Sequence, residues 1–157
     1  MKKVLLVLST SGTGQEVIDY AVGRARKEGA GLIALYILET GLANGVFDTF
    51  TDVGFIGDKP SQDLSEAIMK EYRQRGYEEL GRVQVKAMEE AVDFEPLMED
   101  GGYVEKTLEA IEGRGVLAAV LVKRREKMFL KYFSISHADE VKAQARCEVV
   151  IFTEREG

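Results

Sequence analysis

The chain has 157 residues, of which 45% are hydrophobic and 31% charged, and its formal net charge is -6. This length predicts one domain, and the composition is that of a globular protein with a substantial core. The negative charge argues against a nucleic-acid binder, which would carry a basic domain. We therefore expect a single domain over residues 1–157 and no nucleic-acid partner.

The cysteine content and the apolar runs indicate the cellular compartment of the protein. A single cysteine, Cys147, excludes an intramolecular disulfide and a zinc site built on cysteine pairs. The first apolar run, VLLVL, is shorter than the roughly 7–15 residues of a signal peptide's apolar region. No run reaches the ~18 apolar residues that indicate a membrane span. We expect a cytoplasmic protein without a membrane span.

The predicted strands are short aliphatic runs. Three of them show little alternation of polar and apolar residues, which is typical of strands covered on both faces in a parallel sheet. A fourth run closes the chain, and the segment FEPLME adds an edge strand, because Pro96 cannot donate to a ladder. The four aliphatic runs are Val4 to Leu8, Leu32 to Leu38, Val116 to Val122 and Val149 to Phe152.

Helical patterns separate these strands. Thr13 and Glu16 have the spacing of a capping box, and Gly29 can end the helix that they begin. Residues 40–60 scatter Gly, Asn and Asp among phenylalanines and predict a long ordered loop pinned by its aromatic side chains. The later helices are expected from Ser61 to Ala91, weakened at Gly76 and Gly81, around Val104, Leu108 and Ile111 up to Gly113 or Gly115, and from Ala138 to Arg146.

The order of elements is strand and helix in alternation, with strands at both ends. This order predicts an α/β fold, a single doubly wound domain with a five-stranded, mainly parallel sheet flanked by helices. Ligands of such sheets sit beyond the carboxyl ends of the strands, where the strand order reverses. Two segments there carry suitable groups, STSGTG at residues 9–14 and VKRREKMFLKYFSISHADEV at residues 122–141.

The second segment is basic in an acidic chain. It permits two interpretations: Lys123, Arg124 and Arg125 bind a small anion with their side chains, or the loop is solvated by charges that Glu126 partly neutralises. His137, the only histidine, has no Ser-His-Asp or metal-ligand spacing around it, so we interpret it as a polar residue at a helix start. No catalytic residue and no metal ligand is predicted.

Comparison with known doubly wound families narrows the number of families to which the chain could belong. A receiver domain is excluded, because the first strand ends in Ser and Thr instead of metal-binding acidic residues. A flavodoxin-like FMN site is a minor alternative: STSGTG partly matches a flavin phosphate loop, but only TEREG follows the last strand, where flavodoxins have a helix.

The segment KKVLLVLSTSGTGQEVIDYAVGRARKEGAGLIALYILE resembles the amino-terminal half of universal stress proteins, and ADEVKAQARCEVVIF resembles their closing helix and strand. The resemblance implies the strand order 3-2-1-4-5. It also implies a homodimer formed by antiparallel pairing of the carboxyl-terminal edge strand across a two-fold axis. The interface residues would be Glu148, Val149, Val150, Ile151 and Phe152.

The chain departs from the nucleotide-binding members of that family. They carry an Asp at the end of the first strand, where Ser9 stands here. Their Gly-x-x-Gly, which precedes a Gly-Ser/Thr pair, falls on Lys123 and Glu126, and the pair falls on Ile135 and Ser136. Glycines let the backbone approach a triphosphate closely, and Lys, Glu and Ile do not. The chain thus resembles the branch of the family that lacks the ATP motif.

We therefore expect a non-enzymatic stress-response or regulatory protein that acts as a dimer, with a protein partner that the sequence does not identify and no cofactor. The alternative is a small-ligand protein that binds a nucleotide, such as ATP, or another phosphate anion in the same crevice. The candidate ligand residues are Ser9, Thr10, Ser11, Gly12, Ile37, Lys123, Arg124, Arg125 and Ser136.

Overall fold

A computed structural model describes residues 2–39, 58–123 and 136–153 of the chain. Strands and helices alternate along these residues, and the five strands form one sheet in the order β3-β2-β1-β4-β5. Every pairing in the described sheet is parallel, which confirms the predicted fold and strand order. The elements are β1 Lys3–Val7, α1 Gln15–Glu28, β2 Gly31–Leu38, α3 Asp58–Glu89, β3 Phe94–Asp100, α4 Tyr103–Gly113, β4 Val116–Lys123, α5 His137–Gln144 and β5 Glu148–Thr153.

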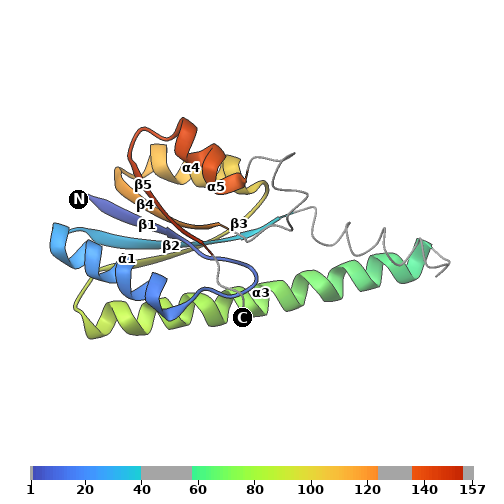
Figure 1. Cartoon of the computed structure of the whole chain (residues 1–157). Helices are drawn as coiled ribbons and strands as arrows, with labels where there is room; N and C mark the ends of the chain where they lie inside the picture. Colours follow the sequence, from blue (N-terminus) through green and yellow to red (C-terminus); the bar gives the residue numbers. More distant parts are fainter. Residues whose placement is uncertain (1, 40–57, 124–135, 154–157) are drawn as a thin grey trace.

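The sheet is covered on both faces (Figure 1), with α1 and α3 on one side and α4 and α5 on the other. Successive residues of β1 point to opposite faces, so Val4 and Leu6 pack toward α1 and α3 while Leu5 and Val7 pack toward α4 and α5. All eight residues of β2 are buried, as its aliphatic sequence predicts. The core therefore has two layers, one on each side of the sheet.

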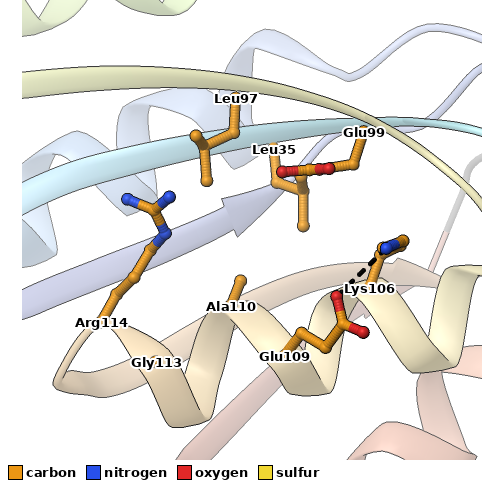
Figure 2. A pocket seen from close by; sticks show the side chains of 8 residues that line it. All are labelled: Leu35, Leu97, Glu99, Lys106, Glu109, Ala110, Gly113 and Arg114. Atoms are coloured by element: carbon orange, nitrogen blue, oxygen red, sulfur yellow. Dashed lines mark hydrogen bonds and ion pairs between the residues drawn. The ribbon is translucent and has the colours of Figure 1, made fainter.

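The outer part of the α4 side is less completely covered. A cavity of about 480 Å³ lies between α4 and the strands β2 and β3, with Leu35 and Leu97 among its lining residues (Figure 2). Two cations at its rim have partners, since Lys106 Nζ lies 3.2 Å from Glu109 Oε2 and Arg114 Nη1 lies 2.5 Å from a carboxylate oxygen of Glu95. None of the predicted ligand residues that the structure describes lines this cavity.

Of the two predicted boundary signals of α1, the one at its end is confirmed and the one at its start is wrong. Gly29 ends the helix in the left-handed conformation, φ 63°, and Ala30 N–H donates to Ala25 O at 2.9 Å. The predicted capping box is wrong, however. The N-cap residue is Gly14, which makes no side-chain cap. The Thr13 hydroxyl instead accepts a hydrogen bond from the Ser9 N–H, in the loop before the helix.

Helix α3 begins at Asp58, three residues before the predicted start, and ends at Glu89, two before the predicted end. The predicted loop over residues 40–60 lies mostly outside the described residues, and only its last three belong to α3. Gly76 lies where α3 packs against side chains of β2 and β3. A Cβ atom there would be 2.5 Å from Met98 Cε and 2.7 Å from Tyr36 Cδ1, so only glycine allows this contact.

Replacing Gly76 with alanine is expected to destabilise the protein by about 1–3 kcal/mol, because the added methyl group overpacks a filled contact. This loss exceeds the gain of about 1 kcal/mol in helix propensity. Gly81 is the matched control, since a Cβ atom there meets nothing within 4 Å. Gly81→Ala is expected to stabilise the protein by up to about 1 kcal/mol. Urea denaturation of both variants checks this, and equal changes in the two would contradict the packing argument.

Candidate functional site

Most of the predicted ligand residues that the structure describes lie at the carboxyl ends of two neighbouring strands, β1 and β4. Residues 9–12 follow β1, Lys123 ends β4, and Ser136 comes directly before α5. The chain leaves β1 toward α1 on one face, whereas α5, which follows β4 in the chain, lies on the other face. This divergence is the topological switch point at which doubly wound sheets bind ligands. The structure thus brings the loop after β1 and the residues at the end of β4 to the same edge.

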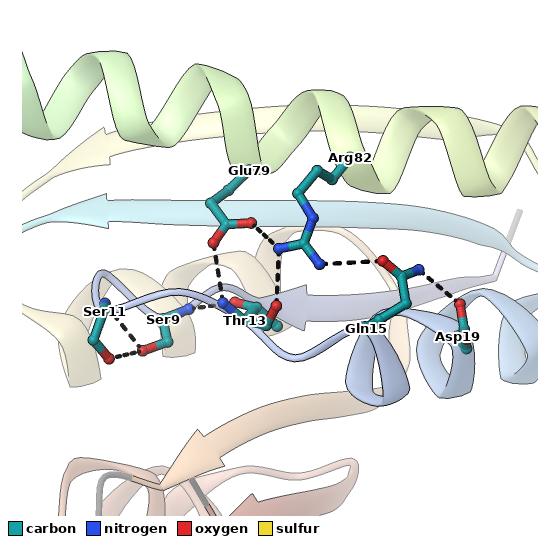
Figure 3. A network of polar contacts seen from close by, with 7 residues as sticks. All are labelled: Ser9, Ser11, Thr13, Gln15, Asp19, Glu79 and Arg82. Atoms are coloured by element: carbon teal, nitrogen blue, oxygen red, sulfur yellow. Dashed lines mark hydrogen bonds and ion pairs between the residues drawn. The ribbon is translucent and has the colours of Figure 1, made fainter. Parts of the chain in front are cut away.

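Loop 9–14 is closed by its own hydrogen bonds (Figure 3). Ser9 N–H donates to Thr13 Oγ1 at 2.9 Å, and Gly12 N–H donates to Ser9 O at 3.1 Å. Ser11 N–H donates to Ser9 Oγ at 3.3 Å, and the hydroxyls of Ser9 and Ser11 share a further hydrogen bond of 2.9 Å. The N–H groups of Ser9, Ser11 and Gly12, three of the predicted ligand residues, therefore donate to acceptors within the loop.

A carboxylate of α3 completes the hydrogen bonding of the loop. Thr13 N–H donates to Glu79 Oε1 at 3.0 Å, and the other Glu79 oxygen accepts from Arg82 Nη1 at 2.6 Å. The same nitrogen of Arg82 donates to Thr13 O at 2.9 Å, and Nη2 donates to Gln15 Oε1 at 3.1 Å. Figure 3 shows Glu79 and Arg82 reaching from one helix onto the loop. Glu79 occupies the position beside a helix start that suits an anion.

At the end of β4, Asp139 joins two of the predicted residues. Lys123 Nζ donates to Asp139 Oδ2 at 2.9 Å, and Ser136 Oγ donates to the same oxygen at 2.6 Å. Ser136 is the N-cap of α5, and its hydroxyl accepts the Asp139 N–H at 3.1 Å. The hydrogen bond from Ser136, followed by that from Lys123, lowers the pKa of Asp139. Lys123 thus has an anionic partner within the chain.

The other predicted residues have different positions. Ile37 is buried in the core on the α4 and α5 side, so its side chain supports the edge and does not line it. Thr10 is half-buried in loop 9–14. Arg124 and Arg125 lie outside the described residues. His137 is the first residue of α5, in agreement with its interpretation as a helix-start residue.

Sequence reasoning missed Glu79, Arg82 and Asp139. The spacing of Ser136 and Asp139 is that of an N-cap and its third residue, so this pair had a local signal. Glu79 and Arg82 had none, because their partner Thr13 lies 66 and 69 residues away. Within the described residues, no group of three His, Cys, Asp or Glu side chains could hold a metal ion. No helix in that part of the chain is long and apolar enough to cross a membrane.

A comparison with protein families matches residues 1–153 to the universal stress protein family. The chain belongs to this family. Among solved structures, the universal stress protein UspA of Lactobacillus plantarum is 17% identical with a TM-score of 0.70, covering 96% of this chain and 97% of that one. A universal stress protein of Burkholderia pseudomallei is 19% identical with a TM-score of 0.65, covering 96% and 94%.

A third universal stress protein, from Archaeoglobus fulgidus in complex with dAMP, is 15% identical with a TM-score of 0.61, covering 96% of this chain and 97% of that one. At these identities the likeness shows the fold alone. A search of curated proteins found no match.

The contacts of Asp139 predict an acid-dependent loss of stability. Because the folded protein lowers the pKa of this carboxyl, its stabilising contribution is present above the unfolded pKa and lost as pH falls through the folded one. Asp139→Asn is expected to cost about 1 kcal/mol or less at neutral pH and to flatten the acid limb below about pH 4. Urea midpoints measured against pH check this. Glu140→Gln, which removes the same charge from the next residue, is the control and should keep the wild-type slope.

Proposed function

We propose that this universal stress protein is a non-enzymatic stress-response or regulatory protein that does not use ATP. One observation carries the proposal: two anion-binding groups of the described residues at the switch point are already bonded within the chain. The Thr13 N–H is held by a carboxylate of α3, and Lys123 is held by Asp139. A phosphate would have to displace these contacts before it gained its own.

The displacement is costly for electrostatic reasons. A phosphate placed at the Thr13 N–H would stand against Glu79, and two anions that share one donor repel each other. Removing Glu79 from the loop would in turn break its 2.6 Å contact with Arg82. Each lost hydrogen bond is worth about 0.5–1.5 kcal/mol net, and more when a charged group takes part. These costs oppose nucleotide binding in the described arrangement.

The placement of the chain's most reactive side chains supports a non-enzymatic role. The only histidine, His137, begins α5 at the carboxyl edge of the sheet, whereas the only cysteine, Cys147, precedes β5 at the opposite edge. They cannot form a nucleophile and base pair, which needs hydrogen-bond contact. Burial raises the pKa of the Cys147 thiol, so the thiolate is disfavoured. A single cysteine also suits a reducing cytoplasm.

The second candidate is a small-ligand protein that binds a nucleotide or another phosphate anion at the same edge. It is favoured by two structural neighbours, universal stress proteins described in complex with dAMP and with cAMP. Calorimetry with Mg-ATP and Mg-free cAMP separates the candidates. We expect no saturable heat from the wild-type protein, and a low-micromolar Kd for either nucleotide would establish the second candidate instead.

The proposed assembly is a homodimer through β5. This strand ends the described sheet, and β4 covers only one of its edges. Its position is fixed from α1, since Arg24 donates to both oxygens of Glu148 at 2.6 and 3.2 Å and the Tyr20 ring packs edge-on against Phe152. An ordered apolar edge strand is a natural pairing site. Antiparallel pairing of two copies would cover it in both subunits.

Removing the Glu79 carboxylate is expected to create an anion site. Glu79→Ala leaves Arg82 without its anionic partner and exposes the Thr13 N–H, so phosphate should stabilise the variant by about 1–2 kcal/mol at roughly ten times its Kd. Phosphate and chloride at equal ionic strength should affect the wild type alike. Glu78→Ala, the matched control, removes the neighbouring exposed carboxylate and should also show no phosphate preference. Thermal melts check this. A wild-type preference for phosphate over chloride equal to that of Glu79→Ala would contradict the inference that the Glu79 carboxylate occupies the anion position.

The dimer is tested at Val150, which is half-buried in the middle of β5. The wild type is expected to sediment as a dimer at micromolar concentration. Val150→Lys should give a folded monomer, because it places a charge at the edge and keeps the backbone donors. Val150→Pro also removes one backbone donor and should yield a monomer or insoluble protein. Gln84→Lys places the same charge on α3 and should remain dimeric. A monomeric wild type would refute the proposed interface.

A further inference from the structure

The outward side of α3 carries a stripe of exposed apolar side chains. The three exposed large hydrophobic residues of the described chain are Tyr77, Val85 and Met88, with exposed fractions of 62%, 57% and 71%. With Gly81 they lie within roughly 80° of one another around the helix axis, at 3.6 residues per turn. The stripe lies on the second half of α3, whose opposite side packs into the core on the same face of the sheet as α1 (Figure 1). Single exposed apolar residues are normal, but a gathered group of them marks an interaction surface.

Gly81, in the middle of this stripe, has no packing reason within the described part of the chain. A Cβ atom there would meet nothing within 4 Å, whereas one at Gly76 would collide with side chains of β2 and β3. Gly81 also lacks the positive φ that favours glycine at positions such as Gly29. Glycine lowers helix stability relative to alanine, so its presence on an exposed helix face is explained when another molecule approaches the backbone closely.

The spacing of the stripe is that of a helix–helix contact. Tyr77, Gly81, Gln84 and Met88 follow one another at intervals of four, three and four residues, which is the heptad spacing of packed helices. These intervals read the same from both ends. Two antiparallel copies of α3 would therefore place Tyr77 of each beside Met88 of the other, an aromatic–thioether contact, and Gly81 beside Gln84. Val85 of each copy would fill the space that Gly81 of the other leaves open.

The charges along one edge of the stripe favour a second copy of the chain as its occupant. Arg75, Glu78, Lys86 and Glu89 follow on that edge in the order plus, minus, plus, minus. An antiparallel copy presents the same edge in reverse, so Arg75 meets Glu89 and Glu78 meets Lys86, each pair twice. Arg82, which lies between them, is turned onto loop 9–14 and has an anionic partner in its own helix. A parallel copy would instead oppose the two different edges of the stripe.

We propose that α3 binds α3 of a second copy of this chain, antiparallel and about a two-fold axis that passes between Gly81 and Gln84. The contact extends over residues 75–89, about 21 Å of helix. This length gives a small interface, in the class of weak and transient contacts below about 1,200 Å². We expect a Kd of about 100 µM, so the contact forms at high local concentration. It uses neither β5 nor the switch point, and if β5 also pairs, the two contacts link dimers into larger assemblies.

The test measures self-association of the full-length Val150→Lys variant, in which the proposed β5 contact is removed. Sedimentation equilibrium between about 10 µM and 1 mM should show a monomer–dimer equilibrium with a Kd of about 100 µM. The wild type should pass from dimer to larger species over the same range. A wild type with the same monomer–dimer curve as Val150→Lys would refute the β5 interface and support the α3 contact, so the failure of either proposal is recognised separately.

Variants then locate the contact on α3. Met88→Glu places a charge against Tyr77 of the other copy and should weaken association about tenfold or more, because the contact removes that charge from water. The matched control is Ala67→Glu, which adds the same charge to an exposed residue of the same helix outside residues 75–89 and should stay within about twofold. Gly81→Ala should weaken association about threefold although it stabilises the single chain, since its methyl group fills the space that Val85 of the other copy needs.

A charge exchange tests the antiparallel register. Arg75→Glu or Glu89→Arg alone places like charges opposite each other in two symmetric pairs and should weaken association about fivefold. The double variant Arg75→Glu/Glu89→Arg restores opposite charges in both pairs and should return to within about twofold of the starting protein. High salt should reduce these differences, because the pairs are exposed to solvent.

Several results would overturn the proposal. A Val150→Lys variant that stays monomeric up to about 1 mM, with no species beyond the dimer in the wild type, would reject the contact outright. Equal weakening by Met88→Glu and Ala67→Glu would show a general effect of charge. A double charge variant no stronger than its single variants would reject the antiparallel register. Should Val150→Lys fail to fold, the same substitutions are made in the wild type, where they should suppress the species larger than a dimer.

Discussion

Burial of both faces of the central strands is the constraint on which the rest of this structure depends. The residues of β2 are buried throughout, and those of β1 are buried from Val4 onward. Apolar strands of this kind need helices on both sides, and parallel strands need a helical crossover between them. The chain meets both requirements with two helices on each face. As a result, all strand carboxyl ends lie at one edge, where the loops that carry polar side chains gather.

The close approach of α3 to the sheet links the core to that edge. Gly76 lets the helix backbone come within contact of the buried Tyr36 ring, on the side where α1 also packs. Glu79 and Arg82 lie one and two turns further along the same helix, and both reach loop 9–14. Their positions follow from a packing contact, since a displaced α3 would not bring the Glu79 carboxylate to the Thr13 N–H. Core packing therefore decides which hydrogen-bond partners the loop after β1 has.

Two carboxylates at the carboxyl edge have donors within the chain. Glu79 accepts from a backbone N–H and from Arg82, and Asp139 accepts from Ser136 and Lys123. At the switch point, the described donors Thr13 N–H and Lys123 are therefore bonded from within the chain.

The sequence by itself determined the order of the elements, the parallel sheet and the position of β3 at an edge, because aliphatic runs, helical periodicity and Pro96 are local signals. It also placed Ser9, Lys123 and Ser136 at the carboxyl edge of the sheet, since the ends of parallel strands meet there. Only the tertiary structure decided what those residues bind. Thr13 was predicted to cap α1, but its hydroxyl closes the loop instead. Glu79 lies 66 residues from its partner, and a contact between residues so distant leaves no periodic or spacing signal in one chain. The hydrogen-bond partners of a loop depend on which helix packs over it, and that is settled by packing.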